Sequence, residues 1–298
     1  MLTRMVASTL PFIPKRIVGR VAKRYVAGEQ LQDALDVVRS MNERGAMGTI
    51  DLLGEEVKER SKALAATEEY NRILEQLHLH GLRSNISVKL TLLGLKIDET
   101  LCSENVERLA ITAKSYGNFL RIDMEDHTCT DATLRIYKQL QEIHGNLGVA
   151  LQAYLRRTLA DIDALPGCGT NVRLCKGIYT EPPSLAWTSH STIQANYLHT
   201  LEKLIRRGVY VAIATHDEYL VCQAIALIDK HKLSRERYEF QMLLGVLPEL
   251  RDIILASGHR LRVYIPYGMD WHAYSIRRLR ENPRIALHVL RAIGHAQN

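Results

Sequence analysis

Eight short segments rich in β-branched and aromatic residues recur along the chain and constrain its fold more than any other feature. Their starts lie on the order of 30 residues apart, the length of a βαβ unit. The gaps hold segments of helical periodicity, such as Glu55–Leu77, Glu104–Ser115 and Asp131–His144. Eight such units predict an α/β protein built as a (β/α)8 barrel. The predicted strands are Gly48–Leu53, Ile86–Leu92, Phe119–Met124, Gly148–Tyr154, Asn171–Cys175, Val209–Thr215, Tyr238–Leu243 and Leu261–Ile265.

The domain organisation follows from the same pattern. The 298 residues show no shift in composition and no low-complexity linker, which favours one barrel over two domains. We expect the barrel to occupy residues 46–298. Residues 1–45 then form an N-terminal extension that starts basic and ends in a helix over Glu29–Asn42, with Leu31, Leu35 and Val38 on one face.

A doubly wound sheet is the alternative architecture. It is less favoured because no G-x-G-x-x-G motif follows a predicted strand. The nearest match, Gly167-Cys168-Gly169, has Val172 where the third glycine should stand. The phosphate-binding loop G-x-x-x-x-G-K-[ST] is also absent from the sequence. A nucleotide cofactor would therefore have to be held by barrel loops and side chains.

The basic surplus of the chain lies at its start. The formal net charge is +6, and residues 1–28 contain no Asp or Glu, whereas the remainder is balanced. Two interpretations stay open, a solvated basic surface and a peripheral element that docks on an anionic membrane. Nucleic-acid binding is disfavoured because such proteins usually spread basic residues over a face of the domain. The basic residues of the segment are Arg4, Lys15, Arg16, Arg20, Lys23 and Arg24.

Cysteine usage and hydropathy bear on the compartment. The five cysteines are odd in number and form no C-x-x-C pair, which fits a reducing compartment. The apolar stretch Met5–Pro14 contains two prolines and no A-x-A cleavage pattern, so a secretory signal is disfavoured. No run reaches the roughly 18 apolar residues of a membrane span. We therefore expect a cytoplasmic protein, with the inner face of the cell membrane as its docking surface under the second interpretation.

Polar side chains stand at the C-terminal end of nearly every predicted strand. In a barrel, catalytic groups come from these ends, while strand interiors are usually branched and apolar. Buried unpaired charges cost several kcal/mol, so these groups must pair with one another or face a ligand. The ends read Ser87-Val-Lys89-Leu-Thr91, Arg121-Ile-Asp123-Met-Glu125-Asp126, Leu151-Gln152-Ala-Tyr154, Arg173-Leu-Cys-Lys176-Gly177, Ala214-Thr215-His216-Asp217, Phe240-Gln241-Met-Leu243 and Val263-Tyr264-Ile-Pro266-Tyr267.

Two other kinds of site are disfavoured. His216-Asp217 is the one strand-end pair that suggests a metal ligand, but there is no H-E-x-x-H motif, and His78 and His80 lie outside the strand-end set. No metal site is therefore predicted. No G-x-S-x-G elbow is present, which disfavours a Ser/His/Asp triad.

A helix after the eighth strand carries the sharpest local pattern. Asp270 can cap a helix that begins at Trp271 and ends at Asn282-Pro283. Two adjacent guanidiniums beside a tyrosine suit capture of a carboxylate or phosphate, although a solvated face is the commoner meaning of such a pair. The residues that share this face are Tyr274, Arg277, Arg278 and Glu281.

Taken together, these segments resemble the proline dehydrogenase family, from about residue 28 to the C-terminus. The resemblance implies flavin-dependent oxidation of L-proline to 1-pyrroline-5-carboxylate, in the compact form without a fused aldehyde dehydrogenase. Its carriers are Gly48-Thr-Ile-Asp-Leu-Leu-Gly-Glu55, Ser87-Val-Lys89-Leu-Thr91, Ile122-Asp123-Met124-Glu125, Leu151-Gln152-Ala-Tyr154, Val172-Arg173-Leu-Cys-Lys176-Gly177-Ile178-Tyr179, Ala214-Thr215-His216-Asp217, Glu239-Phe-Gln-Met-Leu-Leu-Gly245, Tyr264-Ile-Pro-Tyr-Gly268 and Tyr274-Ser-Ile-Arg277-Arg278-Leu-Arg-Glu281-Asn282. One departure is Ile178, where the family usually has alanine.

The resemblance also implies residue roles. Asp123 and Arg173 would form the catalytic set, with Arg173 near the reactive face of the flavin. The substrate would be bound by Lys89, Leu243, Tyr264, Tyr274, Arg277, Arg278 and Glu281. The cofactor, FAD, would be bound by Met124, Gln152, Arg173, Lys176, Gly177, Ile178, Thr215 and His216.

The implied partners are L-proline, a membrane quinone that reoxidises the flavin, and a pyrroline-5-carboxylate dehydrogenase that receives the product. No nucleic acid is expected. The alternative enzymes are other flavin-dependent barrels of the folate reductase or imino-acid oxidase type. A basic nucleic-acid-binding protein is the non-enzymatic alternative.

Overall fold

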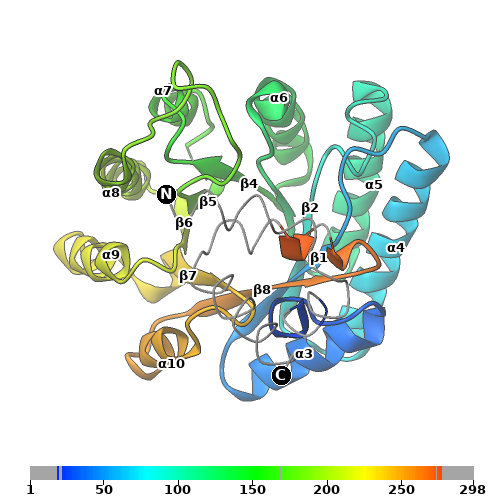
Figure 1. Cartoon of the computed structure of the whole chain (residues 1–298), viewed down its shortest axis with the longest axis horizontal. Helices are drawn as coiled ribbons and strands as arrows, with labels where there is room; N and C mark the ends of the chain where they lie inside the picture. The colour runs from blue at the N-terminus through cyan, green and yellow to red at the C-terminus, as the bar shows by residue number, and fades with distance from the viewer. Residues whose placement is uncertain (1–18, 20–21, 168, 273, 277–298) are drawn as a thin grey trace, which may run out of the picture.

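The computed structural model describes residues 19, 22–167, 169–272 and 274–276. Its eight parallel strands follow one another around a closed barrel in chain order (Figure 1). They are β1 Met47–Leu52, β2 Ser84–Val88, β3 Leu120–Ile122, β4 Leu147–Gln152, β5 Asn171–Cys175, β6 Tyr210–Ala214, β7 Tyr238–Leu243 and β8 Leu261–Tyr267. β8 closes the ring against β1, with Met47 opposite Arg262 and Leu52 opposite Tyr267. The predicted (β/α)8 barrel is confirmed.

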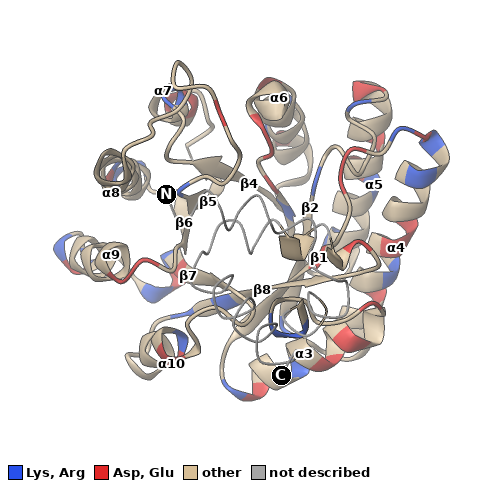
Figure 2. Ribbon diagram, in the orientation of Figure 1, with Lys and Arg blue, Asp and Glu red and all other residues tan. Residues whose placement is uncertain are grey.

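Helices form an outer ring around the strands (Figure 1). They are α3 Leu31–Glu43, α4 Arg60–Leu79, α5 Glu99–Ser115, α6 His127–His144, α7 Thr158–Asp163, α8 His190–Arg206, α9 Glu218–Lys230 and α10 Pro248–Ala256, with a short 3-10 helix η2 at Arg235–Arg237. The longer helices bury apolar side chains on the barrel. In α3 these side chains include Leu31, Leu35 and Val38, as its periodicity predicted. Charges of both signs lie along α3 and α4 (Figure 2), as expected for solvated helix faces.

Two helices begin earlier than their periodicity predicted. α5 starts at Glu99 and not at Glu104, because the Asp98 side chain accepts hydrogen bonds from the Thr100 and Leu101 amides. α6 likewise starts at His127 and not at the predicted Asp131, because the Asp126 side chain accepts a hydrogen bond from the Thr128 amide. Aspartate is a favoured N-cap residue because its carboxylate satisfies amides that have no partner within the helix.

The second strand is shorter than predicted. The segment Ile86–Leu92 was expected to be extended throughout, but β2 ends at Val88. The Leu92 and Leu93 amides both donate to the Lys89 carbonyl, which turns the chain away from the sheet. The turn leaves Lys89 at the strand end, where its side chain reaches the barrel interior.

The end of the basic N-terminal segment packs on the C-terminal end of the barrel. Residues 22–25 are helical, the Ala27 amide donates to the Pro266 carbonyl at 2.9 Å, and the Gly28 carbonyl accepts from Gly268 at 3.0 Å. Arg24 Nε donates to the Gly245 carbonyl at 3.1 Å. Gly245 has φ +74°, and a Cβ there would lie 1.9 Å from the Arg24 carbonyl oxygen, so only glycine permits this approach. Residues 22–28 are thus a wall of the barrel mouth.

No helix in the described part of the chain is both long enough and apolar enough to cross a membrane.

Candidate active site

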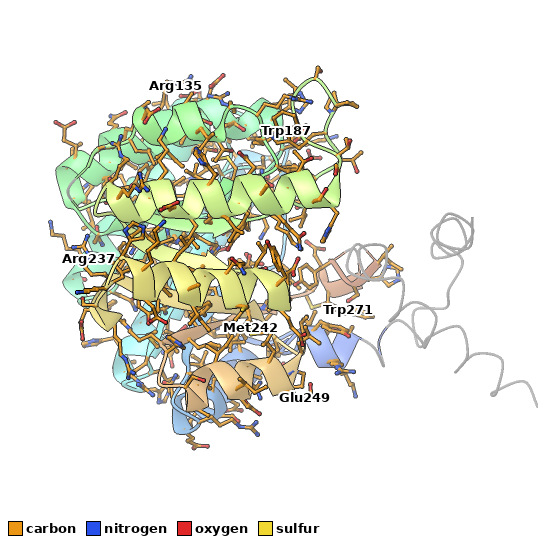
Figure 3. The ribbon with its side chains drawn as sticks, turned by 90° about the vertical axis from the view of Figure 1, so that its left-hand side faces the viewer. Arg135, Trp187, Arg237, Met242, Glu249 and Trp271 are labelled. Carbon is orange, nitrogen blue, oxygen red and sulfur yellow. The ribbon has the colours of Figure 1, made fainter. Side chains whose placement is uncertain are left out.

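A cavity of about 720 Å³ opens at the C-terminal ends of the strands. Figure 3 shows this end of the barrel on the right, where Trp187 and Trp271 lie, whereas Arg237 lies towards the opposite end. Of the residues that the sequence assigned to substrate, cofactor or catalysis, those that line the cavity are Lys89, Asp123, Met124, Gln152, Arg173, Lys176, Gly177, Ile178, Thr215, His216, Leu243, Tyr264 and Tyr274. Arg277, Arg278 and Glu281 lie outside the described residues.

Asp123, at the end of β3, organises the floor of the cavity. Its Oδ1 accepts from Ser87 Oγ at 2.6 Å and forms a close ion pair with Arg173 Nη1. Its Oδ2 accepts from the Tyr264 hydroxyl at 2.8 Å. Burial by itself would raise the pKa of Asp123, but the cations of Arg173 and Lys89 lower it below its usual value. Asp123 is therefore held as a carboxylate.

Lys89 is the second cation of the floor. Its Nζ lies 2.6 Å from Asp51 Oδ1 and 3.8 Å from Asp123 Oδ2, and 3.4 Å from the Tyr264 hydroxyl. Desolvation lowers the pKa of a buried lysine, but Asp51 and Asp123 more than offset this and raise the pKa of Lys89 above its ordinary value. Lys89 therefore faces the cavity as an ammonium group.

Arg173 comes from the inner face of β5. Its Nε donates to Gln241 Oε1 at 2.6 Å, and its Nη1 contacts Asp123 and Ser87. Its Nη2 is buried and has no hydrogen-bond partner among the described residues. The guanidinium also lies over the Tyr264 ring, with Cζ 5.3 Å from the ring centroid. A buried cationic donor without a protein partner, on the wall of a cavity, is suited to an anionic or electron-rich ligand.

Another part of the cavity wall is built from β4, β6 and the loop after β5, next to the strand that carries Arg173. Gln152 donates from Nε2 to the Glu125 carbonyl at 2.9 Å, and its Oε1 lies 3.4 Å from the Ile178 amide. Lys176 Nζ lies 3.2 Å from Asp217 Oδ2. His216 Nε2 accepts from the Leu243 amide at 2.8 Å, which assigns the proton of a neutral ring to Nδ1.

Gly177 shapes the same wall. Its φ is +117°, and a Cβ would lie 2.1 Å from the Tyr154 ring. Only glycine lets the backbone pass this close to the ring. Ile178, which follows it, is 37% exposed and lines the cavity.

The structure adds residues that the sequence reasoning did not assign to the site. Asp51 pairs with Lys89, and Ser87 donates to Asp123. Strand alternation could have pointed to both residues, because Asp51 lies two residues after Thr49 and Ser87 two residues before Lys89. Tyr25 also lines the cavity and packs in a cluster with Leu53 and Tyr274. No sequence signal connects Tyr25 with the barrel, because it lies in the segment before α3.

Three charged residues of the strand-end motifs do not line the cavity: Arg121, Glu125 and Asp126, the last of which caps α6. Arg121, predicted there with Asp123, lies deeper in the barrel, where Nη1 donates to the carbonyls of Val149 at 3.1 Å and Asn171 at 2.9 Å. Glu125 accepts from the Thr91 amide at 3.0 Å. Arg121 precedes Asp123 by one full alternation, so it faces inward but one level lower.

A closed (β/α)8 barrel with paired cations and carboxylates around a cavity at its C-terminal face has the architecture of a barrel enzyme. The family model described as proline dehydrogenase matches residues 34–289. The chain is 35% identical over 286 residues to proline dehydrogenase of Deinococcus radiodurans, covering 94% of this chain and 92% of that protein. It is 35% identical over 272 residues to proline dehydrogenase 1 of Bacillus subtilis, covering 91% and 90%.

The chain therefore belongs to the proline dehydrogenase family, whose members oxidise proline in the first step of its degradation. The resemblance read from the motifs and the predicted enzyme class are confirmed. Among solved structures, proline utilization A (PutA) of Bdellovibrio bacteriovorus matches with a TM-score of 0.82 and 24% identity. That match covers 88% of this chain and 32% of the PutA chain, and it bears on the fold alone. Family membership implies a flavin cofactor.

Proposed function

We propose that this protein oxidises L-proline to 1-pyrroline-5-carboxylate with bound FAD as hydride acceptor and a membrane quinone as final acceptor. The observation that carries the proposal is a cavity at the C-terminal ends of the strands. The assigned residues within the described part of the chain line it, and they come from seven strands and the segments that follow them. The family match favours this activity over the folate reductase and imino-acid oxidase alternatives.

The cavity has features that suit a flavin. Arg173 Nη2, which has no hydrogen-bond partner within the described residues, supplies a cationic donor. The backbone at Gly177 passes close to Tyr154, which keeps this part of the wall free of a side chain. When bound, FAD would supply the two-electron acceptor for the ring carbon next to nitrogen. The residues that would hold it are Met124, Gln152, Arg173, Lys176, Gly177, Ile178, Thr215 and His216.

The floor of the cavity suits a small amino acid. Lys89 presents an ammonium that can pair with the substrate carboxylate, with Arg277, Arg278 and Glu281 as the further residues proposed for that end. Tyr264, Tyr274 and Leu243 would wall the pyrrolidine ring. Because the Tyr264 hydroxyl is engaged with Asp123, the ring is fixed in place before substrate arrives.

The charges of Arg173 and Asp123 have distinct roles in the proposal. The Arg173 cation stabilises negative charge that develops as the hydride is accepted. Asp123 orients Arg173 through Nη1 and balances its charge. The pKa of Asp123 is lowered, mainly by Arg173 against the effect of burial, so Asp123 acts as an electrostatic partner and is a poor proton acceptor at neutral pH.

The first test is spectroscopic. The purified protein should be yellow, release FAD on denaturation, and lose its visible flavin absorbance when L-proline is added without oxygen, whereas D-proline serves as the control for the binding geometry. A soluble quinone should then restore the absorbance. A protein that stays colourless after incubation with FAD, or a bound flavin that L-proline leaves oxidised, would contradict the proposal.

We also propose that the product passes to a pyrroline-5-carboxylate dehydrogenase.

We further propose that the basic N-terminal segment docks the barrel on an anionic membrane where the quinone resides. Because residues 22–28 pack on the barrel, the test of membrane docking removes only residues 2–17. The shortened protein should bind vesicles of anionic lipid more weakly, keep its activity with a soluble acceptor, and behave like the full chain with neutral vesicles. Equal binding of both forms to anionic vesicles would make the segment an ordinary solvated surface.

A further inference from the structure

A chain of buried polar contacts runs beneath the cavity, through the barrel interior. Arg262 Nε lies 2.7 Å from Glu239 Oε1, and its Nη2 lies 3.1 Å from Glu239 Oε2. Gln241 Nε2 donates to Glu239 Oε1 at 2.6 Å, and Gln241 Oε1 accepts from Arg173 Nε at 2.6 Å. Barrel interiors are usually filled with branched apolar side chains, and buried ion pairs stabilise a fold weakly at best. A role beyond packing is therefore expected for this chain of contacts.

The strand order explains how the contacts are made. β7 and β8 are neighbours in the barrel (Figure 1), with Gln241 opposite Arg262. Between β5 and β7, the register pairs Arg173 with Ala212 of β6, and Ala212 with Glu239. The methyl group of Ala212 leaves room for Arg173 and Gln241 to meet across β6.

Glu239 fixes which way the Gln241 amide faces. Burial opposes ionisation, but Arg262 in particular lowers the pKa of Glu239 to about 2. Glu239 is thus a carboxylate and can only accept hydrogen bonds. The NH2 group of Gln241 must turn towards it, and the amide oxygen must turn towards Arg173.

Arg262 in turn is anchored to other strands. Its Nη1 donates to the Gly48 carbonyl at 2.6 Å and lies 3.1 Å from Asn85 Oδ1. Glu239 also accepts from the Tyr210 hydroxyl at 3.0 Å. The orientation of Gln241 is therefore set by groups on β1, β2, β6 and β8, below the cavity.

We propose that Gln241 is a positioning residue that, with its amide oriented by the Glu239–Arg262 pair, fixes the plane of the Arg173 guanidinium at the cavity. Asp123 and Ser87 hydrogen-bond to Nη1 alone, and the Tyr264 ring contacts the guanidinium without a directional hydrogen bond. Gln241 holds Nε on the adjacent edge, so the two contacts together define the plane and the direction of Nη2. The inference rests on the proposed function, because it assigns Arg173 to the flavin.

The variant that tests this is Gln241→Met, which keeps the length of the side chain and removes both amide groups. Gln141→Met is the matched control. Gln141 is similarly buried, and it donates to the Gly169 carbonyl at 3.0 Å and accepts from the Leu147 amide at 2.8 Å, on the outside of the barrel. Both variants lose a buried amide, but only Gln241→Met alters Arg173.

We expect Gln241→Met to retain flavin and to keep the KM for proline within about twofold of wild type. The rate of flavin reduction should fall about tenfold, because a loosened cation stabilises the reduced flavin less well. We expect the equilibrium between oxidised and reduced flavin to shift by the same factor. For a two-electron couple, a tenfold shift corresponds to about 30 mV, so the flavin potential should become about 30 mV more negative. Gln141→Met should show neither change. A wild-type potential and reduction rate in Gln241→Met would overturn the proposal.

Because Gln241 itself borders the cavity, a double-variant cycle separates action through Arg173 from direct contact with the flavin. In an Arg173→Met background, Gln241→Met should change the potential no further. An additive shift would show that Gln241 acts on the flavin directly, which contradicts positioning.

A crystal structure of Gln241→Met without flavin tests positioning independently of the cofactor. The Arg173 guanidinium should rotate away from its wild-type orientation, and an unchanged orientation would overturn the inference. This result stands even if wild-type protein fails to bind flavin or to react with proline, which would be a failure of the proposed function alone.

Discussion

Replacing Arg173 with methionine is expected to slow the reduction of bound flavin by L-proline by about two to three orders of magnitude, the usual effect of removing one preorganised electrostatic contact from a reacting centre. Stopped-flow measurement of flavin absorbance under anaerobic conditions gives the rate directly. The KM for proline should change much less, because Lys89 remains in place to pair with the carboxylate.

Loss of Arg173 also removes the main cation that holds down the pKa of Asp123, against the effect of its burial. The pKa of Asp123 should therefore rise in the Arg173→Met variant. Where the ionisation of this carboxyl appears in the pH profile of flavin reduction, its apparent pKa should move to higher pH. Arg251→Met is the matched control, because Arg251 is also buried but pairs with Asp252 on α10, away from the cavity. A wild-type reduction rate in Arg173→Met would remove Arg173 from the catalytic set.

Replacing Lys89 with methionine is expected to affect both stability and substrate binding. Asp51 is fully buried and lies 2.6 Å from Lys89 Nζ. Removing one partner of a buried ion pair typically costs about 3–5 kcal/mol, because the remaining charge is left uncompensated. The free energy of unfolding in urea should fall by about that amount, and the KM for proline should rise at least about tenfold.

A second variant separates these two effects. In Lys89→Met/Asp51→Asn the uncompensated carboxylate is gone, so most of the lost stability should return. The KM for proline should stay high, because the cation that faces the substrate is still missing. Recovery of the KM together with stability would show that Lys89 serves the fold and does not bind the carboxylate.

Much of the cavity was foreseen from sequence because strand alternation and barrel topology act together. Lys89, Asp123 and Arg173 belong to different strands, and a parallel barrel brings the C-terminal ends of its strands to one face. Their meeting at one face of the barrel could therefore be predicted from their positions at strand ends, without knowing which side chains contact one another.

Other features were beyond the reach of local patterns. Arg121 and Asp123 share the inner face of β3 and differ only in their level along the barrel axis. That level decides which neighbours each one meets, and it depends on the register between strands. Tyr25 reaches the cavity because the segment before α3 folds back over the barrel mouth, a path that no periodicity within the segment encodes.

The sequence by itself determined the order of strands and helices, the inward alternation of polar residues and the family, because these are properties of local periodicity and of motifs in chain order. The tertiary structure alone decided which polar groups pair, including Asp51 with Lys89 and the chain from Arg262 to Arg173. The physical reason is that strand stagger around a closed barrel sets the height of each inward side chain. Groups far apart in sequence can exchange hydrogen bonds only when that stagger brings them to the same level.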